Sequence, residues 1–211
     1  MPENAMKLGE SVLAAAAEKA AASLSAWINR PVSLAWKSPG EMAVEEAGGM
    51  LGEPDAIVPV CILEVSGPVN GRLILVNDAA TIAGFINTLM GMDAGVTADQ
   101  ELQIRDNPTA FWDELARSAA LETANIVACA FLNALAASLP ADKSHGLMPS
   151  PPRFAVDYAG SLAQFLLAEF ALRTGRILVI ESQMLLDDRL RSDWRLIWIP
   201  GEAEASSGLN Q

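Results

Sequence analysis

One segment, from about Phe111 to Leu139, constrains the fold of this chain more than any other, because it is long, almost entirely apolar and marked by a single polar stripe. The polar residues are spaced four, three and eight positions apart, which places their side chains on one face of a helix. They are Ser118, Glu122, Asn125 and Asn133. The other faces carry large apolar residues, which favour burial. We therefore expect a core helix whose one polar face is a candidate site.

The composition indicates a compact globule without nucleic-acid or membrane partners. The chain has 211 residues, enough for one domain or two small ones with a real core. Hydrophobic residues make up 51% of it and charged residues 19%, which argues against disorder. The net charge of −12 disfavours binding to nucleic acid or to an anionic membrane, because phosphate groups would be repelled.

Two apolar segments imitate export or membrane signals. The run Val12–Ala17 is too short for a signal core, and Glu10, Glu18 and Lys19 interrupt it. The segment Thr123–Ala141 is long enough to span a bilayer, but it contains two asparagines and a proline and lacks flanking basic anchors. We expect a buried core helix and a soluble, cytoplasmic protein.

The cysteine and histidine content excludes several kinds of site. Cys61 and Cys129 each lie in an apolar run, so we expect two buried, reduced thiols, as is typical of cytoplasmic proteins. His145 is the single histidine, which leaves no basis for a histidine-based triad or a multi-histidine metal site. Glu122 and Asn125 have no third ligand nearby in the sequence, so we expect no metal site there either.

Local patterns divide the chain into two halves with the same order of elements, namely a long helix, a short strand, a helical insert and a hairpin. In the first half Pro31 ends the long helix, because proline cannot continue one, and an Asn-Gly turn joins the hairpin strands. The elements expected in this half are the helix 5–28, the strand 32–36, a loop 39–54 with one helical turn around Met42 to Ala47, and the strands 57–65 and 71–76. Asp78 can cap a further helix over 79–90.

The second half repeats this order. It is expected to contain the helix 111–139, a proline-rich loop 148–152, the strand 153–157, the helix 160–173 and the strands 176–185 and 193–199. The repetition indicates one domain, residues 1–202, made of half-repeats at about 5–92 and 110–200, followed by a frayed tail, 203–211. The expected fold class is α/β, a pseudo-symmetric duplicated unit in which two long helices pack on one mixed or antiparallel β-sheet.

The polar stripe has a plausible chemistry. A carboxamide both donates and accepts hydrogen bonds, so Asn125 could hold a water molecule in line with an electrophile, and Glu122 could pair with a lysine of a partner. Ser118 could add one more hydrogen bond. If the leaving group is good and the partner brings its own Mg²⁺, positioning the water is most of the remaining work, and an aspartyl phosphate on another protein fits that description. From the spacing alone, however, the solvated edge of a packed helix is the favoured interpretation.

The order Ser118-x-x-x-Glu122-x-x-Asn125 resembles the signature helix of the CheC/CheX/FliY family of chemotaxis phosphatases, in which a proline follows some twenty residues later. Pro149 lies about one residue beyond that place. The segments 151–161, 199–202 and 23–32 resemble further parts of the family pattern, so that the resemblance covers residues 5 to 202.

The resemblance implies a CheC-like fold and hydrolysis of the aspartyl phosphate on a CheY-like response regulator. It implies that Asn125 orients the attacking water, that Glu122 anchors to a lysine of the regulator, and that Ser118 and Pro149 support them. The protein would need no cofactor of its own, because the regulator supplies Mg²⁺. Some members also bind the deamidase CheD, a second candidate partner. The alternative is a non-catalytic adaptor of the same fold, binding a response regulator, a flagellar switch component or CheD.

The sequence departs from the family pattern in its first long helix. CheC-type proteins often carry a second Glu-x-x-Asn there, but this chain has Ser11 and Ala14 at those places. Because alanine has no side-chain donor or acceptor, we expect one active site per chain.

Overall fold

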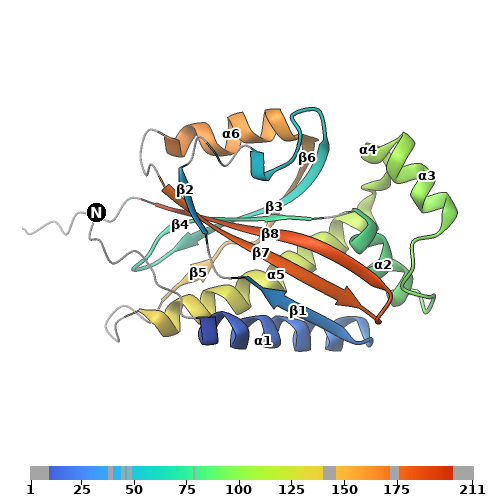
Figure 1. Ribbon diagram of the computed structural model, residues 1–211, viewed down its shortest axis with the longest axis horizontal. Coiled ribbons are helices and arrows are strands. Elements are labelled where there is room, and N and C mark those ends of the chain that lie inside the picture. Colours follow the sequence, from blue (N-terminus) through green and yellow to red (C-terminus); the bar gives the residue numbers. More distant parts are fainter. Residues whose placement is uncertain are drawn as a thin grey trace, which may run out of the picture.

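An eight-stranded sheet with helices on both faces forms the body of the protein (Figure 1). The computed structural model describes residues 10–37, 40–43, 46, 49–77, 79–139, 146–171 and 176–201. The predicted tail 203–211, Asp78, His145 and the start of the first helix, 5–9, lie outside these residues.

The elements follow the predicted order closely. The helices are α1 (Glu10–Ile28), α2 (Ala79–Leu89), α3 (Ala98–Asp106), α4 (Pro108–Phe111), α5 (Glu114–Ser138) and α6 (Ala159–Ala171). The strands are β1 (Val32–Trp36), β2 (Gly40–Ala43), β3 (Ile57–Ser66), β4 (Gly71–Val76), β5 (Met148–Pro149), β6 (Arg153–Tyr158), β7 (Arg176–Leu186) and β8 (Leu190–Pro200).

The sheet exchanges strands between the two halves of the chain. Its order is β1-β7-β8-β4-β3-β5, with β2 also beside β7 and β6 also beside β3, and every pairing is antiparallel. The short strands of each half thus pair with the hairpin of the other half, and the two hairpins meet where β4 pairs with β8. This arrangement confirms the expected α/β fold with long helices on one sheet and gives the sheet as antiparallel. The division into half-repeats at 5–92 and 110–200 stays a prediction.

Two hydrophobic cores lie on opposite faces of the sheet. Helices α1, α2 and α5 cover one face, where α1 and α5 pack side by side (Figure 1). Large aromatic side chains fill this core, with the Phe131 ring 6.2 Å from that of Trp198 and the Phe85 ring 6.1 Å from that of Trp194. Helix α6 covers the other face through Ala159 and Leu162.

Helix α5 has the length and composition of a membrane-spanning segment. It is the one helix in the described part of the chain with both properties, and 61% of its most apolar window is buried inside the protein. A core helix of a globular protein has this pattern of burial, in agreement with the sequence-based expectation.

Two elements differ from the prediction. The helical turn expected around Met42 to Ala47 is wrong for its first residues, since Gly40–Ala43 form β2 and pair with β7. The conformation of Gly40–Ala43 is decided by pairing with the edge of β7, and a pattern within the segment itself carries no information about that distant strand. Helix α3 was missed because none of its residues is buried, so it has no hydrophobic period. Its signal is the capping box of Thr97 and Gln100, and Gln100 also exchanges two 2.9 Å hydrogen bonds with the buried Asn87.

The junction between the two hairpins is a test of this architecture. A Cβ atom at Gly71 would meet the buried Trp198 ring at 2.8 Å and the carbonyl of Ile199. We expect Gly71→Ala to lower the free energy of unfolding by about 2 kcal/mol, the usual cost of overpacking. Urea denaturation measures the change. Gly95→Ala is the control, because a Cβ there has nothing within 4 Å; equal stability of the two variants would contradict the close approach of β4 and β8.

Candidate functional site

Helix α5 presents the polar stripe to the outside because its opposite side is fixed to the sheet. The helix begins after Asp113, whose side chain accepts a 2.9 Å hydrogen bond from the amide of Ala116. On the inner side the Cys61 thiol of β3 donates to the Ala120 carbonyl at 3.5 Å. With this side buried, Ser118, Glu122 and Asn133 are exposed and Asn125 is half-buried.

The four predicted site residues Ser118, Glu122, Asn125 and Pro149 line one open groove of about 580 Å³. Helix α5, including Leu121, forms one wall of this groove and the segment 149–152 forms the other. Asn133 does not belong to the groove, because it lines a separate cavity of about 270 Å³ between α1 and α5. The structure therefore brings together the residues that the family pattern selects and separates the last member of the stripe.

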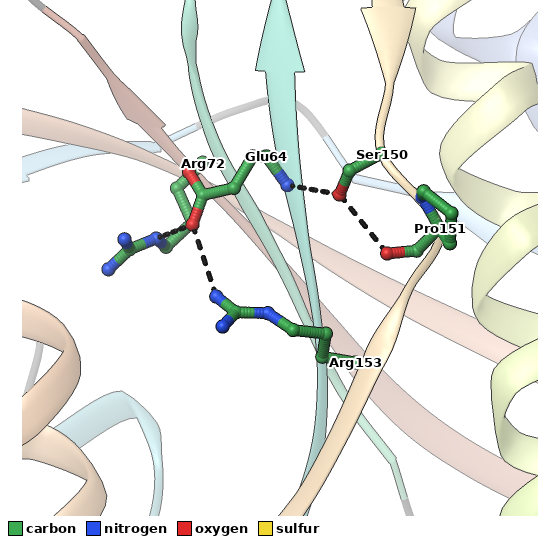
Figure 2. A network of polar contacts seen from close by, with 5 residues as sticks. All are labelled: Glu64, Arg72, Ser150, Pro151 and Arg153. Atoms are coloured by element: carbon green, nitrogen blue, oxygen red, sulfur yellow. Dashed lines mark hydrogen bonds and ion pairs between the residues drawn. The ribbon is translucent and has the colours of Figure 1, made fainter.

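The second wall is a β-bulge. Pro149 pairs with Val65 and Arg153 pairs with Ile62, so three residues, 150–152, face only two on β3. A bulge bends its strand and re-aims the side chains on it. Figure 2 shows Pro151 on the side of this segment that faces α5, consistent with its place in the lining of the groove.

An aromatic contact lies near the start of α5, beside a second cavity that adjoins the groove. The Phe154 ring of β6 lies 5.0 Å from the Trp112 ring and 5.8 Å from the Arg117 guanidinium. The Nε of Arg117 donates to the Trp112 carbonyl at 2.8 Å, which holds the Arg117 side chain over the Phe154 ring. Arg117 and Trp112 line a second cavity of about 530 Å³, which shares Ser118 and Leu121 with the groove. Sequence reasoning missed this extension, because it depends on contacts between segments far apart in the chain.

Neither the Glu122 nor the Asn125 side chain forms an ion pair or a short hydrogen bond within the described residues. Glu122 forms no ion pair with any described residue, so its carboxylate is available to a partner. The Asn125 carboxamide has one polar side-chain contact within the described residues, a long one of 3.9 Å from the Cys129 thiol. On α1, Ser11 and Ala14 are both exposed, so the corresponding face there carries a hydroxyl and a methyl group.

The expectation of two buried thiols is half wrong. Cys61 is fully buried, and burial raises the pKa of its thiol to about 12. Cys129 is exposed, because it lies four residues after Asn125 and shares the outer face of α5. Burial of part of the side chain and, to a smaller extent, the charge of Glu122 raise the pKa of the Cys129 thiol. The four-residue spacing from Asn125 indicated that Cys129 is exposed, but the apolar residues around it favoured the prediction of burial.

In the described part of the chain, no group of three or more His, Cys, Asp or Glu side chains is arranged to hold a metal ion. The groove has carboxamide, carboxylate and hydroxyl groups on one wall and prolines on the other. This arrangement can orient a water molecule and bind a cation of a partner, both of which are non-covalent tasks.

Comparisons with known proteins show what this fold is similar to. The sequence matches no protein-family model and no curated protein significantly. Among solved structures, Thermotoga maritima FliY superposes with a TM-score of 0.65 at 18% identity, over 92% of this chain and 88% of that one. A chain of the FliG–FliM complex from H. pylori gives 0.60 at 11% identity, over 95% and 96%. The chemotaxis protein CheX from Desulfovibrio desulfuricans gives 0.50 at 9% identity, over 90% and 99%. The expected CheC-like fold is thereby confirmed.

Thiol alkylation tests the geometry of the stripe. We expect a maleimide to modify Cys129 and to spare Cys61 in the folded protein. Because the pKa of Cys129 is raised, its thiolate is scarce at neutral pH and the rate should keep increasing as the pH rises past the range of an ordinary thiol. Glu122→Gln removes a negative charge that disfavours the thiolate, so it should accelerate the reaction at neutral pH. Asp188→Asn, an exposed charge in the β7–β8 turn, is the control; equal rates in both variants would place Glu122 away from Cys129.

Proposed function

We propose that this protein is a phosphatase that hydrolyses the aspartyl phosphate of a CheY-like response regulator, acting in the cytoplasm in chemotaxis or a related two-component pathway. The observation that carries the proposal is the groove that Glu122 and Asn125 share with the segment 149–152, which we call the proline wall. Neither polar side chain is tied up in an ion pair or a short hydrogen bond within the described residues. The likeness of the fold to FliY and CheX supports it.

In the proposed reaction a water molecule attacks the phosphorus atom of the acyl phosphate. The bond between phosphorus and the carboxylate oxygen breaks, which leaves an aspartate carboxylate on the regulator and inorganic phosphate in solution. The Asn125 carboxamide accepts a hydrogen bond from the water and holds it in line with the breaking bond. The regulator supplies Mg²⁺, which neutralises charge on the phosphoryl oxygens, and the phosphatase needs no cofactor of its own.

Glu122 has the role of an anchor. It lies one helical turn before Asn125, so a lysine of the regulator that pairs with it fixes the distance of Asn125 from the phosphoryl group. The carboxylate is exposed and has no ion pair within the described residues, so the fold does not compete for it. Ser118, one turn earlier in the same groove, adds a hydroxyl to the contact surface.

A non-catalytic adaptor is the second candidate. The middle domain of FliM from H. pylori also has this fold, with a TM-score of 0.56 at 11% identity, and one of the similar structures is that of a FliG–FliM complex. Such a protein would bind a response regulator, a flagellar switch component or CheD without hydrolysing anything. On α1, Ser11 and Ala14 stand where the family pattern has Glu and Asn, which favours a non-catalytic role for the first half of the chain.

Replacement of Asn125 separates the two candidates. We expect Asn125→Ala to lower the rate of regulator dephosphorylation by about 100-fold or more, because the water loses its orienting group, while the affinity for the regulator stays close to that of the wild type. The decay of a phosphorylated CheY-like regulator and its binding are measured in parallel. Asn133→Ala is the matched control, an exposed asparagine of the same stripe outside the groove. Binding of the regulator without accelerated decay in the wild type would assign the protein to the adaptor class.

Replacement of Glu122 tests the anchor. We expect Glu122→Gln to raise the KM for the phosphorylated regulator by about 10-fold with a smaller change in kcat, since a charge-assisted contact contributes about 1–2 kcal/mol. The salt dependence of KM should also become weaker, because one ion pair is lost. A loss confined to kcat would mean that Glu122 acts in the chemical step and not in docking.

A further inference from the structure

We propose that Ser150 is a positioning residue that holds the proline wall of the groove at a fixed distance from Asn125, with Glu64 of β3 as its anchor. The inference rests on the proposed function. Neither residue belongs to the polar stripe, and Ser150 reaches the site only through the bulge between β5 and β6.

The proline wall has very few ways to attach to the sheet. Three of its four residues, Pro149, Pro151 and Pro152, have no backbone N–H group to donate. A strand segment without donors is held poorly, and a bulge interrupts its ladder further. Ser150 supplies the single backbone N–H in the wall, and this group donates to the Glu64 carbonyl at 2.7 Å.

The Ser150 hydroxyl makes the second connection. In a regular antiparallel pair the N–H of Glu64 would donate to a backbone carbonyl of the facing residue. Here the Ser150 Oγ accepts that N–H at 3.0 Å, and the hydroxyl itself donates to the Pro151 carbonyl at 3.1 Å. Figure 2 shows this chain of contacts from Glu64 through Ser150 to Pro151. The hydroxyl therefore replaces a ladder acceptor and at the same time fixes the orientation of the next peptide of the wall.

The Glu64 side chain ties the same point to both neighbouring strands. Its Oε1 atom accepts from Nε of Arg72 on β4 at 2.8 Å and contacts the Arg153 guanidinium on β6 at 3.4 Å (Figure 2). The Arg72 side chain is only 13% exposed, so its position is set by packing. The exposed contact to Arg153 contributes little energy by itself, and the strand just beyond the bulge is held by its backbone pairing with β3.

The first half of the chain provides an internal comparison. Trp36 pairs with Ser182, and the next residue, Lys37, donates its N–H to the Glu181 carbonyl at 2.9 Å, as Ser150 does to Glu64. The pairing also shifts by one residue between β1 and β2, as it does between β5 and β6. The glutamate is thus present in both halves, whereas the serine is replaced by Lys37. Ser150 occurs in the half that carries Glu122 and Asn125, so its hydroxyl accompanies the groove and is not required by the strand pairing that both halves share.

A wall that moves by about 1 Å changes the seat of the regulator relative to Asn125, and misplacements of this size cost up to about 100-fold in rate. We expect Ser150→Ala to lower kcat for the phosphorylated regulator about 10-fold while KM changes less than about threefold. Ser150→Thr keeps the hydroxyl and should restore kcat. Ser66→Ala is the matched control, since the Ser66 hydroxyl donates to the Met148 carbonyl at 3.3 Å and so links the same two strands outside the groove.

Hydrogen exchange of the free protein gives a readout that does not depend on turnover. The amides of Glu64 and of residue 150 should exchange about 10-fold faster in Ser150→Ala than in Ser66→Ala. Unchanged exchange at these amides would show that the Ser150 hydroxyl does not hold the proline wall to β3. Faster exchange with a wild-type kcat would overturn the positioning role.

The failure of the proposed function can be distinguished from the failure of this inference. If the wild type has no turnover, the affinity for the regulator replaces kcat as the measure. Weaker binding by Ser150→Ala, but not by Ser66→Ala or Ser150→Thr, would then uphold Ser150 as a positioning residue of a docking groove. Equal binding by all three variants would overturn it.

Discussion

The burial of one side of α5 against the sheet is the constraint on which the rest of the site depends. A helix repeats every 3.6 residues, so the choice of the buried side also fixes what the outer side presents. Rotation by a single residue, about 100°, that brings Glu122 to the buried position of Thr123 would place a carboxylate in the core, and a buried carboxylate without a partner is far too costly for a domain of ordinary stability. The buried apolar residues of α5 therefore determine the orientation of Glu122 and Asn125, although they do not line the groove.

Strand β3 gives both walls of the groove a common reference. Cys61 contacts the Ala120 carbonyl on α5, and three residues later Glu64 holds Ser150 in the proline wall. An odd spacing places two side chains on opposite faces of a strand, so Cys61 can face the helix while the Glu64 carboxylate meets Arg72 and Arg153. The width of the groove is then set within a few residues of one strand, β3. A site built in this way is more rigid than its position beside a proline-rich segment would indicate.

The sequence predicts those parts of the fold that local patterns encode. The period of α5, the two hairpins and the proline that ends α1 are each determined within about a dozen neighbouring residues, and the structure agrees with them. The strand β2, the bulge and the contact of Trp112 with Phe154 depend on partners far away in the chain, so no local pattern could reveal them. Cys129 is a different case, because its phase relative to Asn125 was readable, but the apolar composition of its neighbours pointed the other way. The groove residues were predictable because a helical stripe and a family pattern agreed on them; their chemistry is a separate matter, since an exposed stripe of this kind also occurs on helices without a function.

The two halves of the sheet separate what the fold requires from what the groove requires. Glu64 and Arg72 face each other across β3 and β4, and Glu181 and Arg195 face each other across β7 and β8. The backbone bond to the glutamate carbonyl is also made in both halves, by Ser150 in one and by Lys37 in the other. The Glu–Arg pairs and this backbone bond occur in both halves, although only one half carries the polar stripe. We therefore assign them to the stability of the sheet. The features that differ are Ser150 against Lys37 on the strand and Glu122 with Asn125 against Ser11 with Ala14 on the helix. In the first half the Lys37 ammonium group forms a surface ion pair with Glu181 at 2.6 Å. Lysine has no hydroxyl group, so Lys37 cannot accept a hydrogen bond as the Ser150 side chain does. The strand pairing is thus alike on both sides of the sheet, while the exposed side chains of the stripe differ between them, and this asymmetry limits the candidate site to the half built on α5.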